Sequence, residues 1–429
     1  MIFARRRIQT ALSQLDFVSD AQRRGFATRL NRRTADSLAA MWEVMILHSL
    51  ARAGRVQHEQ PTADGKNPDI VFASADLVFT ADVSCVSDQG IRKRNPFDKL
   101  LNEIEHQKRA LGLGIGGVYI DVGHSEDHLR VTLKLPPEED IPGFVAEQVI
   151  PKIAQKLGEK EWPIKLAWET EAVQFALTIK DGPYSGGGSR AYDTPKATKA
   201  NPIYSRLRAK SEQVRKGSGL RGIFLCDGGY SAFSRSPLGW SGVSAPKIAQ
   251  SFLAESEDVD FVVLVWVEEN SSGWDRRITR SARHTTIQKI PNSALSSVIA
   301  DAIARLPQPK RTGTNARNHL EWKGQHMGFG GGFTIEWPRV KLSATMLMNL
   351  LSGRISIEEF NDRHDWTSGS VQSRGRFPNA FERALREGRL PKAIAVESSP
   401  DDDDDWLVID FGLSDAAVSP FTGNNGGEN

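Results

Sequence analysis

The chain has 429 residues, of which 39% are hydrophobic and 25% are charged. This composition excludes intrinsic disorder for most of the chain, because disordered chains carry too few apolar residues to form a core. The length indicates two or three domains, each long enough to bury a core of its own. Lysine and arginine number 55 against 53 aspartate and glutamate residues, so the net charge of +2 neither favours nor excludes a polyanionic partner.

The cysteines and the hydropathy pattern favour a cytoplasmic protein. Cys85 and Cys226 lie in apolar runs, and a secreted protein of this size would carry a more regular cysteine framework, so we expect buried thiols. The basic stretch from Met1 to Arg7 has no apolar segment after it, and we therefore expect no signal peptide. No window approaches the roughly 18 apolar residues of a membrane span, so no membrane association is expected.

The first third of the chain predicts a helix followed by a β-hairpin. From Thr34 to Gly54, apolar residues recur at the spacing of an amphipathic helix, which Gly54 is expected to stop. The runs 68–72 and 77–86 are rich in β-branched and aromatic residues, with a short turn between them. Further elements are expected as a helix over 96–111, a strand over 117–122, a helix over 144–157 and two strands within 164–179.

The later part of the chain predicts buried strands and then a second domain. After a basic, glycine-rich loop over 182–200, a helix is expected over 202–215, followed by continuous apolar strands at 221–226 and 260–267. This alternation indicates a mixed α/β domain over residues 1–306. The composition changes to proline and basic residues at 307–317, which predicts a smaller α+β domain over residues 307–429. Its elements are expected as helices over 343–352 and 380–387 and a strand over 406–411, with the five aspartates 401–405 as a solvated loop.

Three acidic residues stand in a suggestive order along the predicted helix and hairpin. Glu43 lies in the helix, Asp69 follows a proline at the head of the first strand, and Asp82 lies in the apolar second strand. A carboxylate among apolar neighbours is costly unless a cation or a hydrogen-bond donor meets it. A divalent metal held by two or three carboxylates is the kind of site that hydrolyses phosphodiesters.

Three short segments resemble a known nuclease family. They are Met41-Trp42-Glu43, Gly65-Lys66-Asn67-Pro68-Asp69-Ile70 and Phe79-Thr80-Ala81-Asp82-Val83-Ser84. Together they resemble the PD-(D/E)XK, or restriction-endonuclease-like, core over residues 34–122 and more faintly as far as Cys226. The resemblance implies an α/β fold with a restriction-endonuclease-like mixed sheet flanked by helices, interrupted by an insertion near residues 123–200.

The same resemblance implies a metal site and a catalytic lysine. Glu43, Asp69 and Asp82 match the acids with which the family binds Mg²⁺, or Mn²⁺ in its place. Ser84 stands where the family carries its lysine, two residues after the last acid. Because some members carry this lysine on a neighbouring helix, the candidates in this chain are Lys99, Lys108 and Lys210.

Basic residues cluster around the expected site. Phosphate contacts need only lysine and arginine side chains, so such clusters favour a polyanion channel, although each cluster alone also suits a solvated face. The clusters are Arg23, Arg24, Arg29, Arg32 and Arg33 before the first helix, Arg92, Lys93 and Arg94 after the hairpin, and Lys196, Lys199, Arg206, Arg208 and Lys210 in the later loop and helix.

Each acidic residue also has an ordinary structural interpretation. Asp69 can cap a strand as half of a Pro-Asp turn, and Asp82 can face water from an edge strand. Glu43 alone suits a solvated helix face. His48 and His58 suit a ligand or a DNA contact, but each also suits a surface or packed histidine. Only the three acids taken together indicate chemistry.

The resemblance implies a metal-dependent DNA endonuclease, of a kind that acts in bacterial defence against foreign DNA. The domain after residue 307 would then bind substrate, a partner protein or a second copy of the chain. Ser84 motivates one alternative, a nucleic-acid-binding module without catalysis. A second alternative is a scaffolding subunit of a larger complex, in which residues 307–429 form the docking surface.

Overall fold

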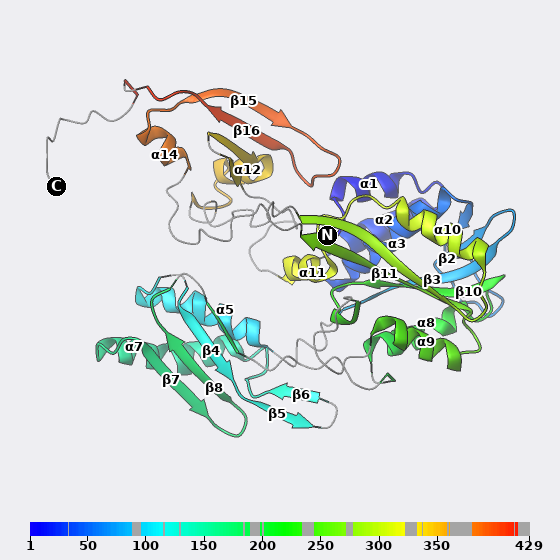
Figure 1. The fold of residues 1–429 in the computed structure, drawn as a ribbon, viewed down its shortest axis with the longest axis horizontal. Coiled ribbons are helices and arrows are strands. Elements are labelled where there is room, and N and C mark those ends of the chain that lie inside the picture. Colours follow the sequence, from blue (N-terminus) through cyan, green and yellow to red (C-terminus); the bar gives the residue numbers. More distant parts are fainter. Residues whose placement is uncertain are drawn as a thin grey trace.

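The computed structural model shows a mixed α/β protein in which a mixed sheet is flanked by helices (Figure 1). None of the described helices is long and apolar enough to cross a membrane. The described residues are 1–32, 34–87, 96–114, 116–127, 130–182, 185–188, 198–199, 201–233, 244–271, 278–321, 333–336, 338–357, 360, 380–415 and 417–418.

A six-stranded sheet forms the centre of the first part of the chain, in the order β1-β2-β3-β10-β11-β12. The pairs β1–β2 and β2–β3 are antiparallel, which confirms the expected hairpin. The central pairs β3–β10 and β10–β11 are parallel, and β12 returns antiparallel to β11. The strands are β1 (Arg55–Gln57), β2 (Ile70–Ala73), β3 (Val78–Val86), β10 (Leu220–Asp227), β11 (Phe261–Ser271) and β12 (Ile278–Gln288).

Helices cover both faces of this sheet. α3 and α10 pack on one face, and α8 and α9 pack on the other (Figure 1). β10 and β11 are therefore buried on both sides, which explains their continuous apolar sequences. The helices are α1 (Arg5–Ser13), α2 (Asp20–Leu30), α3 (Ala35–Ala51), α8 (Pro202–Val214), α9 (Ala245–Glu255), α10 (Ser293–Ala304) and α11 (Gly313–Glu321), with a 3₁₀ turn at Ser231–Phe233.

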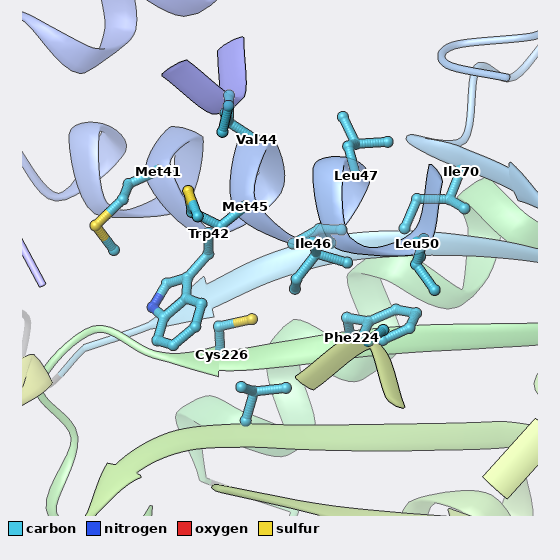
Figure 2. Packing of buried hydrophobic residues seen from close by; sticks show 14 of the residues in the cluster. Met41, Trp42, Val44, Met45, Ile46, Leu47, Leu50, Ile70, Phe224 and Cys226 are labelled. Carbon is cyan, nitrogen blue, oxygen red and sulfur yellow. The ribbon is translucent and has the colours of Figure 1, made fainter. Parts of the chain in front are cut away.

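Helix α3 is buried on nearly all sides, whereas its sequence pattern predicts an amphipathic helix with one solvated face. The difference arises because α1 and α2 pack against it and cover the side that turns away from the sheet. Figure 2 shows Trp42, Met45 and Ile46 over Phe224 and Cys226 of β10. The fully buried Trp42 indole N–H donates to the backbone oxygen of Asp227 at 3.0 Å, so it satisfies a polar group in the core.

Gly54 has a different role from the helix stop that we expected. α3 ends at Ala51, and Gly54 does not have a positive φ angle. A Cβ atom at Gly54 would lie 2.6 Å from the Phe72 ring. The glycine is required because the chain passes close against β2.

A second sheet, in the order β7-β8-β4-β9, has a separate apolar cluster. The sequence interpretation places the strand over 117–122 with the nuclease-like core and starts the insertion near 123. In the structure that strand, β4, pairs with β8 and β9 instead. The elements are α5 (Phe97–Gln107), a 3₁₀ turn (Lys108–Leu111), β4 (Val118–Val122), β5 (His124–Asp127), β6 (Arg130–Leu133), α6 (Ile141–Phe144), a π-helical turn (Val145–Val149), α7 (Ile150–Gly158), β7 (Ile164–Glu169), β8 (Gln174–Ile179) and β9 (Gly186–Gly188).

A third sheet, in the order β13-β14-β16-β15, lies in the C-terminal part with its own apolar cluster. The sequence interpretation opens the second domain at residue 307. In the structure, however, Ala316 and Leu320 of α11 pack with the first core. The C-terminal elements are β13 (Phe333–Glu336), β14 (Arg339–Ser343), α12 (Ala344–Leu351), α14 (Ala380–Arg386), β15 (Pro391–Glu397) and β16 (Trp406–Phe411).

The five aspartates at 401–405 do not form the solvated loop that we expected. Asp401 and Asp405 form ion pairs with arginines of α1, and Asp403 and Asp404 are buried. Asp403 accepts a hydrogen bond from the Arg5 N–H at 2.7 Å. The acidic run therefore joins the C-terminal part to the start of the chain.

The two cysteines are unpaired thiols. Cys226 is buried, as expected from the sequence, whereas Cys85 is only half-buried. The two residues are opposite each other in the β3–β10 pairing. Burial raises the pKa of both thiols, which favours their protonated form.

Phe79 tests the central packing. It is fully buried, stacks on Phe72 with a centroid distance of 4.8 Å and meets the Phe261 ring edge-on. We expect Phe79→Ala to lower the free energy of unfolding by about 3–5 kcal/mol, measured by urea denaturation, because it leaves a cavity in the core. The neighbouring Val78 is 42% exposed, so Val78→Ala should change stability by only about 0.5 kcal/mol. Equal losses for the two variants would contradict this packing.

Candidate active site

Asp69 and Asp82 lie where strand β2 separates from β3. Pairing between these strands begins at Ile70 and Ala81, since the preceding Pro68 has no N–H to donate to a ladder. Oδ2 of Asp69 accepts a hydrogen bond from the Val83 N–H at 2.8 Å and so bridges the opening. The hairpin thus brings together two of the three acids expected to form the site.

Asp82 points to the helix α8 side of the sheet. Side chains alternate along a strand, and α8 packs against β3 on this face. Asp82 is fully buried, and neither of its oxygens has a hydrogen-bond partner among the described residues. The ammonium of Lys210, on α8, lies 3.0 Å from Oδ2 as an ion pair. Of the three candidate lysines, Lys210 is the one that the structure brings to the acids.

Burial raises the pKa of Asp82 well above the usual range of a carboxyl, and the neighbouring Asp69 carboxylate raises it further. Lys210 opposes this rise because its positive charge favours the ionised form. This is the charge environment that a divalent cation would relieve.

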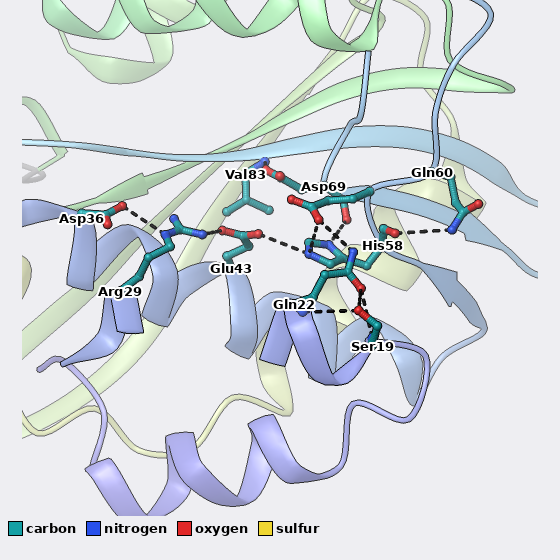
Figure 3. Close-up of polar contacts among 10 residues, drawn as sticks. Ser19, Gln22, Arg29, Asp36, Glu43, His58, Gln60, Asp69 and Val83 are labelled. Carbon is teal, nitrogen blue, oxygen red and sulfur yellow. Dashed lines mark hydrogen bonds and ion pairs between the residues drawn. The ribbon is translucent and has the colours of Figure 1, made fainter. Parts of the chain in front are cut away.

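Glu43 approaches the same region from α3, on the opposite face of the sheet from Lys210. It is 4% exposed, and its Oε2 accepts a hydrogen bond from Arg29 Nη1 at 2.8 Å (Figure 3). Its Oε1 lies 3.9 Å from Nε2 of His58, and Nδ1 of that ring is 2.8 Å from the Asp69 backbone oxygen. Burial raises the pKa of Glu43, as does the charge of Asp69, while Arg29 lowers it.

A cavity of about 630 Å³ opens beside these groups. Its wall combines acidic residues with three cationic side chains, so it can hold an anion near the carboxylates. Asp82 is buried and does not line it. The polar residues that line it are Arg29, Asp36, Glu43, Glu59, Asp69, Ser84, Ser87, Arg206 and Lys210.

The donor set suits a hard divalent cation at the two aspartates. Mg²⁺ is commonly bound by one or two carboxylates, with water and substrate phosphate completing its shell. Asp82 is buried next to Asp69, and its Oδ1 has no hydrogen-bond partner among the described residues, which fits this requirement. Within the described residues, however, no group of three or more His, Cys, Asp or Glu side chains has the arrangement of a metal site.

Several other expected site residues lie elsewhere or outside the described residues. Lys99 is on α5 with its ammonium 4.0 Å from Glu138, and the buried Lys108 pairs with Glu105 at 3.2 Å. The exposed Lys199 pairs with Glu255 at 2.9 Å and does not line the cavity. Arg92, Lys93, Arg94 and Lys196 lie outside the described residues.

How Glu43 is held could not be predicted from the sequence. There Arg29 is one member of a basic cluster, and Asp36 is not among the expected site residues. In the structure, Arg29 bonds both Asp36 and Glu43 because α2 packs against α3. The capping box of α2, which includes Ser19, marks its start in the sequence, but no local signal indicates which residues of α3 it meets.

Compared with known proteins, the chain matches no protein-family model, no curated protein and no solved structure. The fold and the site therefore define this protein by its architecture alone. It is a mixed α/β protein whose central sheet is flanked by helices, with an acidic site at the separation of two strands and a lysine from an adjacent helix.

The raised pKa of Asp82 predicts a pH-dependent stability in metal-free buffer. The folded state binds this proton more tightly than the unfolded state, so the free energy of unfolding should fall as the pH rises above about 4. One such group contributes at most about 1.4 kcal/mol per pH unit. Asp82→Asn should flatten this pH dependence of the free energy of unfolding. The measurement is urea unfolding in EDTA between about pH 5 and 9.

The matched control is Asp76→Asn, at an exposed turn carboxylate of the same hairpin. It should keep the wild-type dependence. A wild-type slope in Asp82→Asn would contradict the assignment of this proton to Asp82.

Proposed function

We propose that this chain is a metal-dependent nuclease that hydrolyses phosphodiester bonds of DNA on a restriction-endonuclease-like core. One observation carries the proposal. The ammonium of Lys210 lies 3.0 Å from Asp82, beside Asp69, although Ser84 stands at the position where the family carries its lysine. A lysine supplied by a neighbouring helix thus accounts for the departure from the family pattern. The order of helix, hairpin, helix and parallel strand supports the same core.

In this proposal Asp69 and Asp82 hold Mg²⁺ or Mn²⁺. When bound, the ion supplies positive charge for the pentavalent transition state and lowers the pKa of a water molecule. Lys210 contributes a fixed ammonium that orients the attacking water and stabilises the developing negative charge. The buried Asp82 in turn holds Lys210 in place, so this lysine spends little entropy on being positioned.

The cavity wall supports an anionic substrate. Arg206 and Lys210 are one turn apart on α8, with the exposed Arg206 side chain beside the cavity. Such groups bind phosphate irrespective of base sequence, which suits nucleic acid. Restriction of foreign DNA in bacteria is the biological role that the resemblance implies for such an enzyme, with a second copy of the chain or a partner protein completing it.

A second candidate function is a binding module or scaffold on the same fold without catalysis. Ser84 at the lysine position favours the former. For the latter, the edge strand β15 exposes Ile394 and Val396, at 64% and 63%, which suits docking of a partner protein. Such a module would bind DNA equally in EDTA and cleave none, and a scaffold would copurify with its partner.

The nuclease proposal predicts cleavage that depends on the two aspartates and the lysine. With Mg²⁺ or Mn²⁺, purified protein should cut supercoiled and linear DNA, and EDTA should stop the reaction. Asp69→Ala and Asp82→Ala should abolish cutting because both carboxylates hold the ion. Lys210→Met should slow the single-turnover rate by about 10²–10³, the usual cost of removing a transition-state charge.

Lys99→Met is the control, because this lysine belongs to the second sheet's helix α5 and pairs with Glu138. It should keep the wild-type rate. Lys99→Met losing activity while Lys210→Met retains it would contradict the role of Lys210. DNA binding without cutting in either metal would support the binding module.

A further inference from the structure

Arg29 is held at the cavity by two carboxylates of the neighbouring helix. Its Nε donates to Oδ1 of Asp36 at 3.2 Å, and its Nη1 donates to Oε2 of Glu43 at 2.8 Å. The guanidinium also lies 5.9 Å from the centre of the Phe26 ring. Figure 3 shows Arg29 between the two acids. These contacts fix one orientation of a side chain that is otherwise flexible.

Glu43 is paired with a cation, Arg29, that a second carboxylate, Asp36, also holds. Its Oε2 accepts a hydrogen bond from Arg29 at 2.8 Å, and its Oε1 lies 3.9 Å from Nε2 of His58. Asp82 likewise has one oxygen, Oδ2, 3.0 Å from the ammonium of Lys210, but its Oδ1 has no hydrogen-bond partner among the described residues. A metal ion at Oε2 of Glu43 would have to displace a short, charge-assisted bond that is largely shielded from water. Oε2 of Glu43 is therefore engaged with Arg29 before any metal ion binds.

We propose that Glu43 is a positioning residue for Arg29 and does not ligate the metal, and that Arg29 binds a phosphate of the substrate in the cavity. This inference rests on the proposed nuclease function and departs from the ligand role that the family resemblance implies for Glu43. The substrate group is a phosphate of the DNA backbone close to the bond that is cut.

The chemistry of arginine supports this role. A guanidinium has five N–H donors in a planar fork that matches phosphate oxygens. The carboxylates use Nε and Nη1, and Nη2 has no acceptor among the described residues. Arg29 lines the cavity together with Arg206 and Lys210. Because its orientation is fixed before substrate arrives, binding loses less conformational entropy than with a free arginine.

The first experiment separates metal binding from substrate binding. Mn²⁺ is titrated into the full chain without DNA, and free Mn²⁺ is followed by electron paramagnetic resonance. Asp69→Asn should weaken Mn²⁺ binding by about tenfold or more, whereas Glu43→Gln should leave it within about twofold of wild type. Equal losses in the two variants would show that Glu43 is a ligand and overturn its positioning role.

The second experiment measures DNA affinity in EDTA at several salt concentrations. Arg29→Gln should weaken binding about tenfold and reduce the slope of log affinity against log salt by about one. Arg29→Lys should recover part of the affinity but not the wild-type value, because an ammonium lacks the planar fork. The matched control Arg305→Gln removes the same charge from the exposed C-cap of α10, which does not line the cavity, and should change the affinity less.

Asp36→Asn provides a second route to the positioning argument. It removes the other carboxylate that holds Arg29 and leaves Glu43 in place, so it remains informative if Glu43→Gln does not fold. Its DNA affinity should fall, as that of Arg29→Gln does, while its Mn²⁺ binding stays at the wild-type level.

A wild-type salt slope in Arg29→Gln would overturn the phosphate-binding role of Arg29.

The proposed function and this inference fail in different ways. If Asp69→Asn binds Mn²⁺ as wild type does and no DNA is cut, the nuclease proposal fails. If Asp69 proves to be required for Mn²⁺ binding and cutting while Arg29→Gln and Arg305→Gln bind DNA alike, the nuclease stands and the role of Arg29 is refuted.

Discussion

A carboxylate buried in a sheet must meet a positive charge or keep its proton, and Asp82 is subject to this constraint. Its side chain points from β3 into the interface with α8, where Lys210 is its charged neighbour. The constraint links the elements of the core. The hairpin must separate at Asp69, the sheet must continue through β10, and α8 must pack with Lys210 turned inward. An uncompensated charge at Asp82 would destabilise this whole arrangement.

The two sides of the sheet contribute differently to the site. On the α8 side, Lys210 pairs with the buried Asp82. On the α3 side, Glu43 pairs with the half-buried Arg29. Neighbouring groups thus compensate much of the local charge before any ligand enters. The cavity between them keeps both signs of charge within reach, which is suited to an ion and a phosphate together.

The sequence predicted those parts of the structure that depend on local patterns. Periodicity and turn residues predicted the hairpin, the buried strands and the helix that carries Lys210. The hairpin in turn predicted that Asp69 and Asp82 lie close together. The sequence could not show that Lys210, and not Lys99, lies beside the aspartates, because this depends on which sheet each helix covers.

Contacts between distant segments explain the other differences. A short apolar strand such as β4 has the same sequence signature whichever sheet it joins, so its pairing with β8 could not be predicted. The pairing of Arg29 with Glu43 depends on the packing of two helices. The acidic run at 401–405 has the composition of a solvated loop, and only the fold shows that α1 neutralises its charge.

The insertion of a second sheet between β3 and α8 has a consequence for how the chain folds. Asp82 precedes that sheet and Lys210 follows it, so their contact closes a long loop with a corresponding loss of chain entropy. The inserted segment has its own apolar cluster, and its collapse would bring the two ends of the loop closer together. The acid and its lysine therefore meet only when segments far apart in the sequence have come together, and a chain that has not brought them together carries no assembled site.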